Sequence, residues 1–181
     1  MKIDQNNAWI ENIYHHPSPN YDQRPTGTEI ELLVIHAISL PPNEFGGQFI
    51  DQLFTNSLDA NAHPDFAEIA QLRVSSHLLI RRNGDIIQYV SLLQRAWHAG
   101  VSSFAGRERC NDFSIGIELE GCDSIAYTDI QYQQLINTIK LMQKIWPILT
   151  PDRIVGHCDI APGRKTDPGP FFDWERLKNG L

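Results

Sequence analysis

Apolar and polar residues follow one another along the chain in patterns that predict interleaved strands and helices. Residues 30–36 (IELLVIH) form a β-branched apolar run, which is typical of a buried strand. Residues 113–120 (FSIGIELE) alternate strictly between apolar and polar positions, which predicts a strand with one face in the core. Ile154 and Val155 indicate a further short strand that leads into the polar stretch GHCDIAPGRKTDP.

A hairpin is predicted by two β-branched segments, residues 74–80 and 86–92, which are joined by the loop RRNGD. The pair Asn83-Gly84 within this loop favours a tight primed turn, because both residues tolerate positive φ. Residues 57–72 look irregular or weakly helical.

Three segments show helical features. Residues 47–56 carry apolar side chains at helical spacing and predict a short amphipathic helix. Thr128 and Gln131 form a capping box that opens a longer apolar-periodic helix, which Pro147 ends. Residues 171–178 (FFDWERLK) predict a terminal helix. Strands interspersed with helices imply an α/β fold in which a mixed central sheet is flanked by helices.

Length and composition bound the fold and the class of protein. The 181 residues suit a single domain, which we expect to span 1–181 with a catalytic core at about 30–175. The formal charge of -7 argues against a general nucleic-acid role, because such proteins usually carry a basic surplus. Three irregularly spaced cysteines, no signal-peptide pattern at the amino terminus and no long apolar stretch together predict a cytoplasmic protein without a membrane segment.

Candidate metal ligands lie at the ends of two predicted strands. His36 ends the first buried strand and His157 ends the last, and α/β sheets tend to present their sites at such ends. Zinc hydrolases commonly combine two histidines with one carboxylate. That carboxylate could come from Asp159 or Asp167, and the Ala161-Pro162-Gly163 turn favours Asp167 by folding the chain back. The alternative is a pair of hydrogen-bonded histidines near strand ends.

Candidate catalytic groups lie near these ligands. Glu118 and Glu120 share the face of their strand that is opposite the apolar side chains, so either could be a general base, and alternation does not choose between them. Lys165 lies two residues before Asp167 in a segment expected to be extended, which would place both side chains on one side. There the ammonium group could stabilise an oxyanion.

Several further residues are candidate ligand contacts. Arginines gather in groups that suggest an anionic ligand, although salt-bridged surface arginines are the alternative for Arg81 and Arg82. Trp97-His98-Ala99-Gly100 could form a sugar- or peptide-contacting rim or hold a half-buried structural tryptophan. His77 is expected to be a hydrogen-bonded interior histidine, and a Cys158–His157 nucleophilic pair is not expected.

Four long segments carry a family resemblance. They read HAISLPPNEFGG, AHPDFAEIAQLRVSSHLLIRRNGDIIQYV, RAWHAGVSSFAGRERCNDFSIGIELEG and GHCDIAPGRKTDPGPFFDW. In their order and spacing they resemble the AmpD family of zinc amidases, which belongs to the wider amidase and peptidoglycan-recognition superfamily. The resemblance runs from about Pro17 to Trp174.

The resemblance implies an N-acetylmuramoyl-L-alanine amidase that prefers 1,6-anhydro-muropeptides and uses one zinc ion. It assigns residue roles as follows: zinc ligands His36, His157 and Asp167; catalytic residues Glu118 and Lys165; substrate contacts Arg73, Trp97, Arg109 and Arg164. One departure is Ala37, where the family commonly has asparagine after the first histidine ligand, so a substrate contact from that side chain is not expected.

The same resemblance implies a cellular setting and leaves rival functions to be compared. It implies an anhydro-muropeptide substrate, a cytoplasmic monomer that binds neither nucleic acid nor membrane, a place in peptidoglycan recycling and an indirect influence on β-lactamase induction. A broad-specificity peptidoglycan amidase is the first alternative. A non-catalytic peptidoglycan sensor is the second, and the presence of all three ligands and both catalytic groups argues against it.

Overall fold

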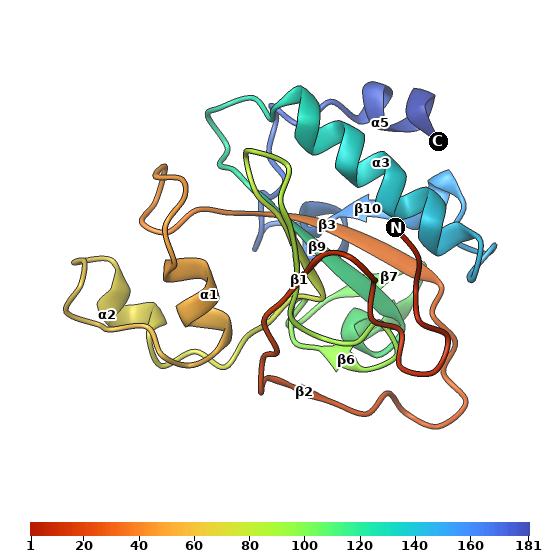
Figure 1. Ribbon diagram of the computed structural model, residues 1–181, viewed down its shortest axis with the longest axis horizontal. Helices are drawn as coiled ribbons and strands as arrows, with labels where there is room; N and C mark the ends of the chain where they lie inside the picture. Colours follow the sequence, from red (N-terminus) through yellow and green to blue (C-terminus); the bar gives the residue numbers. More distant parts are fainter.

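The computed structural model describes residues 1–181 and is built around a six-stranded sheet (Figure 1). In spatial order the strands are β1 (Tyr14–His15), β5 (Ile86–Gln88), β4 (Leu78–Ile80), β9 (Ser114–Glu120), β3 (Leu32–Ile38) and β10 (Ile154–Gly156). Strands β4 and β5 pair antiparallel, whereas the other neighbours pair parallel. The mixed central sheet expected of this α/β fold is therefore confirmed.

Helices and smaller sheets surround this sheet. The helices are α1 (Phe49–Phe54), α2 (Phe66–Ile69), α3 (Asp129–Gln143), α4 (His157–Ile160) and α5 (Trp174–Gly180), with 3-10 turns at η1 (Cys110–Asp112) and η2 (Pro151–Arg153). The two-stranded sheets pair β2 (Tyr21–Asp22) with β6 (Arg95–Ala96), and β7 (Ser103–Phe104) with β8 (Arg107–Glu108). None of the helices combines the length and apolarity that a bilayer crossing requires.

Helix α3 lies across one face of the sheet, with α5 beside it (Figure 1). The predicted capping box is present: Thr128 Oγ1 accepts from Gln131 N (3.3 Å), and Gln131 Oε1 accepts from Thr128 N (3.1 Å). The apolar face of α3 packs into the same core as the odd-numbered residues of β9. The strict alternation of this strand thus sends its apolar side chains to α3 and its even-numbered residues to the opposite face.

The β4–β5 hairpin is confirmed, but its turn differs from the prediction. Only Gly84 has positive φ (88°), so the two-residue primed turn is wrong. Gly84 N donates to Arg81 O (2.9 Å), and Arg81 N donates to Asp85 O (2.9 Å), which makes a wider loop. Asn83 Oδ1 accepts from Asp85 N (3.0 Å), a local bond that holds Asn83 without a left-handed backbone.

The register of β3 and β9 places two polar residues side by side. His36 is paired with Glu118. Two residues further along, at the end of both strands, Ile38 is paired with Glu120. Because Leu33 and Ile35 of β3 pack into the α3 core, His36 projects toward the other face, as Glu118 does. The carboxyl ends of the parallel strands β3, β9 and β10 meet at this edge, which is where such sheets present their sites.

Candidate metal centre and active site

Three potential metal ligands converge at the carboxyl ends of β3 and β10. His36 is in β3, His157 opens α4 directly after β10, and Asp167 lies in the loop that follows α4. His36 Nδ1 and His157 Nδ1 are 3.0 Å apart, and each is 3.1 Å from Asp167 Oδ2. Two imidazole nitrogens and a carboxylate oxygen thus form a nearly equilateral triangle.

Local hydrogen bonds bring Asp167 into this triangle and keep Asp159 out of it. Asp159 Oδ2 accepts from Gly156 N (2.7 Å) and so caps the start of α4. Residues 161–164 then turn, and Cys158 N donates to Asp167 O (2.9 Å), which closes the loop. Of the two aspartates considered, Asp167 is the one that meets the histidines.

The charges of these groups suit a cation. Burial lowers the pKa of His36 to about 4, so its imidazole is neutral at pH 7. Burial raises the pKa of Asp167, but its close contacts with His157 and His36 outweigh that effect and lower its pKa overall. A neutral imidazole beside an ionised carboxylate is the protonation pattern that metal ligation requires.

The spacing of the donors also suits zinc. Zinc binds histidine nitrogen and carboxylate oxygen at about 2.0–2.1 Å in tetrahedral geometry, which places neighbouring donors about 3.3 Å apart. The observed separations of 3.0–3.1 Å are close to that value. Three protein donors would leave a fourth position for water or substrate, as in catalytic zinc sites.

Glu118 lies beside the triangle, and its carboxylate is poorly satisfied. Its Oε2 is buried without a hydrogen-bond partner. Burial raises the pKa of Glu118 well above its ordinary value, the charge of Asp167 raises it further, and Lys165 lowers it in part. A buried carboxylate with a raised pKa is suited to accept and return a proton.

Glu120, the other candidate base, is fully engaged elsewhere. Its Oε1 accepts from Gly46 N (2.6 Å) and Arg81 Nη1 (3.3 Å), and its Oε2 accepts from Arg82 N (3.0 Å). Arg81 is also paired with Asp51 (2.8 Å). Arg81 is therefore salt-bridged, which was one of the alternatives for this arginine.

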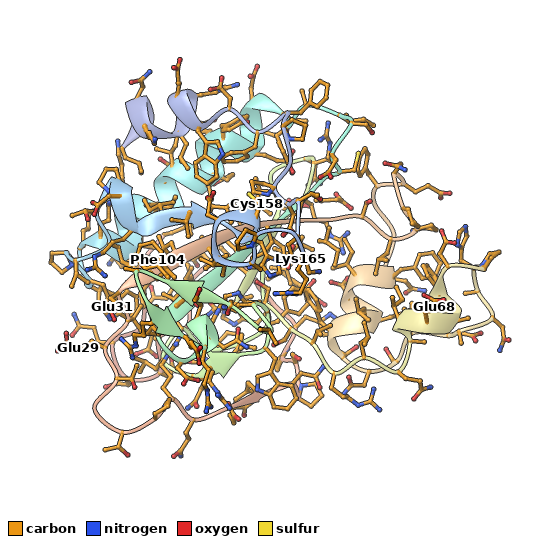
Figure 2. All side chains as sticks on the ribbon, turned by 180° about the vertical axis from the view of Figure 1, so that it is seen from behind. Glu29, Glu31, Glu68, Phe104, Cys158 and Lys165 are labelled. Carbon is orange, nitrogen blue, oxygen red and sulfur yellow. The ribbon has the colours of Figure 1, made fainter.

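Lys165 and Cys158 lie on the segment that surrounds the triangle. Figure 2 shows both near the middle of the molecule in that view, whereas Glu68 of α2 lies at its right-hand edge. Lys165 is exposed, and its charge lowers the pKa of both His36 and Glu118. Cys158 Sγ contacts Asp159 Oδ1 (3.9 Å), and no hydrogen bond joins it to His157.

Arg109 and Arg164 line one cavity of about 590 Å³, which none of the three triangle residues lines, and Arg164 Nη2 lies 3.4 Å from His157 Nε2. Arg164 Nη2 donates to Ala99 O and Val101 O (both 2.7 Å), while the Arg109 side chain is 70% exposed. The other two predicted substrate contacts do not line this cavity. Arg73 bonds only backbone carbonyls of its own segment, and half-buried Trp97 donates its amide to Ser75 Oγ (3.1 Å).

The sequence does not predict the inward position of His98. This residue was considered as part of a rim, but its ring is turned inward, and His36 Nε2 lies 2.9 Å from His98 Nδ1. The available signal was Gly116 on the polar face of β9, because a glycine there leaves room for a ring. His77 is the interior histidine that was expected: burial lowers its pKa to about 3, and Gly116 N donates to its Nδ1 (3.0 Å).

The half-buried Arg24 was also missed, and the sequence offers no signal for it. Its guanidinium donates to backbone carbonyls of Asn111, Asp112 and Ser114 at 2.8–3.0 Å. These bonds fasten the segment 15–28 beneath η1 and the start of β9.

Comparisons with known proteins show which enzymes the whole chain is similar to. Residues 26–170 match the family model described as N-acetylmuramoyl-L-alanine amidase. The chain is 60% identical over 178 residues to the 1,6-anhydro-N-acetylmuramyl-L-alanine amidase AmpD of Escherichia coli strain K12, covering 98% of this chain and 96% of that one.

Solved structures agree with this match. A crystal structure of a selenomethionine AmpD derivative is similar with a TM-score of 0.96 and 57% identity, covering 100% of this chain and 99% of that one. A second similar structure, with a TM-score of 0.61 and 33% identity over 87% of this chain and 60% of that one, is the amidase AmiD from E. coli in complex with anhydro-N-acetylmuramic acid-L-Ala-D-γ-Glu-L-Lys.

Proposed function

This chain belongs to the N-acetylmuramoyl-L-alanine amidase family, and we propose that it hydrolyses the amide between a 1,6-anhydro-N-acetylmuramoyl group and the L-alanine of a stem peptide. That it is an amidase follows from the family. The observation that carries the finer assignment is the triangle of His36, His157 and Asp167 beside an unpaired Glu118 oxygen, in a chain 60% identical to an amidase of that specificity. The proposed amidase domain spans 1–181, with its core at about 30–175.

The proposed cofactor is one zinc ion held by His36 Nδ1, His157 Nδ1 and Asp167 Oδ2. The support is the donor set, two nitrogens and one oxygen within 4.8 Å of one another. Zinc in such a site supplies Lewis-acid chemistry, which lowers the pKa of water to about 7 and polarises a carbonyl.

Glu118 and Lys165 act on the reacting atoms in this proposal. Glu118 accepts a proton at Oε2 from the attacking water and passes it to the leaving nitrogen of L-alanine, which then departs as a neutral amine. Lys165 stabilises the negative charge that develops on the amide oxygen. The support is the buried, unpaired Oε2 of Glu118 and the effect of the Lys165 charge on the pKa of Glu118.

Arg109 and Arg164 are proposed to bind carboxylates of the substrate, because both line one cavity and Arg164 Nη2 lies 3.4 Å from His157 Nε2. Arg73 and Trp97 remain proposed contacts on the resemblance alone.

Metal removal tests the proposal directly. The purified protein should contain about one zinc per chain, lose hydrolysis of an anhydro-muropeptide after exhaustive chelation, and regain it when zinc is restored. His157→Ala should hold no stoichiometric zinc. Undiminished hydrolysis by the stripped protein would refute the metal mechanism.

Substrate preference needs a second comparison. An anhydro-muropeptide should be cleaved faster than the same muropeptide with a reducing end. Equal rates would instead assign the chain to the broad-specificity amidases, and no cleavage of either would favour the non-catalytic sensor.

The cellular setting is proposed from the AmpD relatives alone. We expect a monomeric, cytoplasmic enzyme of peptidoglycan recycling that indirectly restrains β-lactamase induction in a cell with an inducible enzyme. A deletion strain should accumulate anhydro-muropeptides. An unaltered muropeptide pool would contradict the recycling role.

A further inference from the structure

The two ring nitrogens of His36 face different surroundings. Its Nδ1 faces His157 Nδ1 and Asp167 Oδ2, while its Nε2 is 2.9 Å from His98 Nδ1. A neutral imidazole carries one N–H and one lone pair, so the proton that sits on Nε2 decides whether Nδ1 can bind a metal. The partner of Nε2 is therefore important for the metal centre.

A chain of hydrogen bonds fixes where these protons lie. Ser114 Oγ is 2.6 Å from Cys110 O, and a carbonyl oxygen only accepts, so the hydroxyl of Ser114 donates there. Ser114 Oγ must then accept from His98 Nε2–H, which is 3.1 Å away. This leaves His98 Nδ1 with a lone pair that accepts from His36 Nε2–H. The only assignment that satisfies the whole chain leaves His36 Nδ1 unprotonated and directed toward Asp167.

The His98 ring is held in place from two sides. A Cβ at Gly116 would lie 2.6 Å from His98 Cγ and 2.7 Å from its Nδ1, so the ring occupies the space that the missing side chain leaves. The backbone is fixed by Asn111 Oδ1, which accepts from His98 N (3.2 Å) and Ala99 N (2.8 Å). The acceptor for His36 is thus positioned before any ligand binds.

The next residue does the same for the second histidine. Ala99 O is 3.1 Å from His157 Nε2 and can only accept, so His157 carries its proton on Nε2 and its lone pair on Nδ1. Arg164 Nη2 donates to the same carbonyl (2.7 Å). Two consecutive residues therefore select the tautomers of both imidazoles.

We propose that His98 is a positioning residue of the metal centre, which accepts a hydrogen bond from His36 Nε2 and thereby directs His36 Nδ1 to the zinc ion. This inference rests on the proposed function, because it concerns the affinity for zinc. Partners of metal-ligating histidines typically account for about 10–100-fold in metal affinity. Neither the rim nor the substrate-contacting role considered for this segment requires such an effect.

The test compares zinc affinity, measured by competition with a chromophoric chelator, in variants that separate the acceptor from the ring. His98→Phe keeps a ring and removes the acceptor, so its zinc dissociation constant should rise about 10–100-fold. His98→Asn keeps an acceptor near the position of Nδ1 and should recover most of the affinity. His15→Phe and His15→Asn are matched controls, because His15 lies in β1 and contacts none of the ligands.

Two further measurements keep the test decisive if His98→Phe folds poorly. Gly116→Ala should displace the ring and weaken zinc binding in a chain that retains His98. Nitrogen-15 spectra of the metal-free wild type should show His36 protonated at Nε2, and thermal unfolding of the metal-free variants reports their folding.

The outcomes distinguish this inference from the function that it builds on. Wild-type protein that binds no zinc would refute the proposed function and this inference together. Wild-type protein that binds zinc, with equally tight binding by a folded His98→Phe or with His36 protonated at Nδ1, would overturn only the role of His98. Equal losses in folded His98→Phe and His98→Asn would likewise rule out the acceptor.

Discussion

Glu118 and Glu120 lie two residues apart on the same face of β9, and both are buried, yet their carboxylates differ in their hydrogen-bond partners. Three donors reach Glu120: the amides of Gly46 and Arg82 and the guanidinium of Arg81. Glu118 Oε2 has no partner. Buried polar atoms are almost always hydrogen-bonded, so an unpaired one suggests a role outside stability. These two residues differ in how many hydrogen bonds their carboxylates accept, not in how deeply they are buried.

The surroundings of Glu120 explain what it does. Arg81 bridges Glu120 and Asp51, and Asp51 also accepts from the hydroxyl of Tyr89. This network joins β9 to α1 and to the loop that contains Gly46. Glu120 thus holds the elements beside the site, whereas Glu118 faces the site itself.

The largest expected effect tests Glu118, the proposed general base. Glu118→Gln keeps the shape of the side chain but removes the proton acceptor, so kcat should fall by about 10²–10⁴-fold. Zinc content and the free energy of unfolding should stay near the wild-type values. Steady-state turnover of an anhydro-muropeptide checks this, and near-normal turnover would leave the general base unassigned.

The same substitution at the other position should affect stability. Glu120→Gln places an amide donor among three donors, and breaking a buried ion pair costs about 3 kcal/mol or more in the free energy of unfolding. Urea unfolding measures this cost, with exposed Glu175→Gln as the control. The folded molecules of Glu120→Gln should turn over substrate at the wild-type rate. If Glu120→Gln abolished turnover at unchanged stability while Glu118→Gln remained active, the two roles would have to be exchanged.

Lys165 is a further residue to compare, because its charge lowers the pKa of Glu118. Lys165→Ala should reduce kcat by about 10²–10³-fold, the usual effect of removing one oxyanion donor. Exposed Lys178 of α5 provides the matched control, Lys178→Ala. Full turnover by Lys165→Ala with zinc bound would contradict the role proposed for the ammonium group.

Arg109 gives the smallest expected effect and serves as a third case, exposed rather than buried. Its side chain is 70% exposed where it pairs with Asp112 (3.2 Å), and ion pairs of exposed side chains contribute about 0–1 kcal/mol, so Arg109→Ala should leave the free energy of unfolding almost unchanged. The KM for an anionic muropeptide should rise several-fold while kcat changes little. Arg176→Ala, on α5, is the control, and an unchanged KM would remove Arg109 from the proposed binding site.

Much of the fold could be predicted because its signals are local. The alternation of residues 113–120 gives β9, and the pair Thr128 and Gln131 marks the start of α3. The predicted turn type at Asn83 was wrong, because the hydrogen bond from Asp85 N to the Asn83 side chain competes with the primed geometry.

The missed parts of the site depend on contacts between distant segments. Alternation places Glu118 and Glu120 on one face but says nothing of Arg81 or Gly46, which reach Glu120 from 39 and 74 residues away. The ring of His98 similarly depends on the space above Gly116 and on the hydroxyl of Ser114, both of which belong to β9. Only the assembled sheet contains that information.

The pairing of β3 with β9 has a consequence for how the molecule can fail. Sliding β9 by a single residue would turn the Glu118 carboxylate toward α3, since neighbouring side chains alternate between faces. No partly competent arrangement lies between these two registers. A refolded preparation should therefore contain fully working and inert molecules only, and its specific activity should report the fraction of chains that assembled correctly.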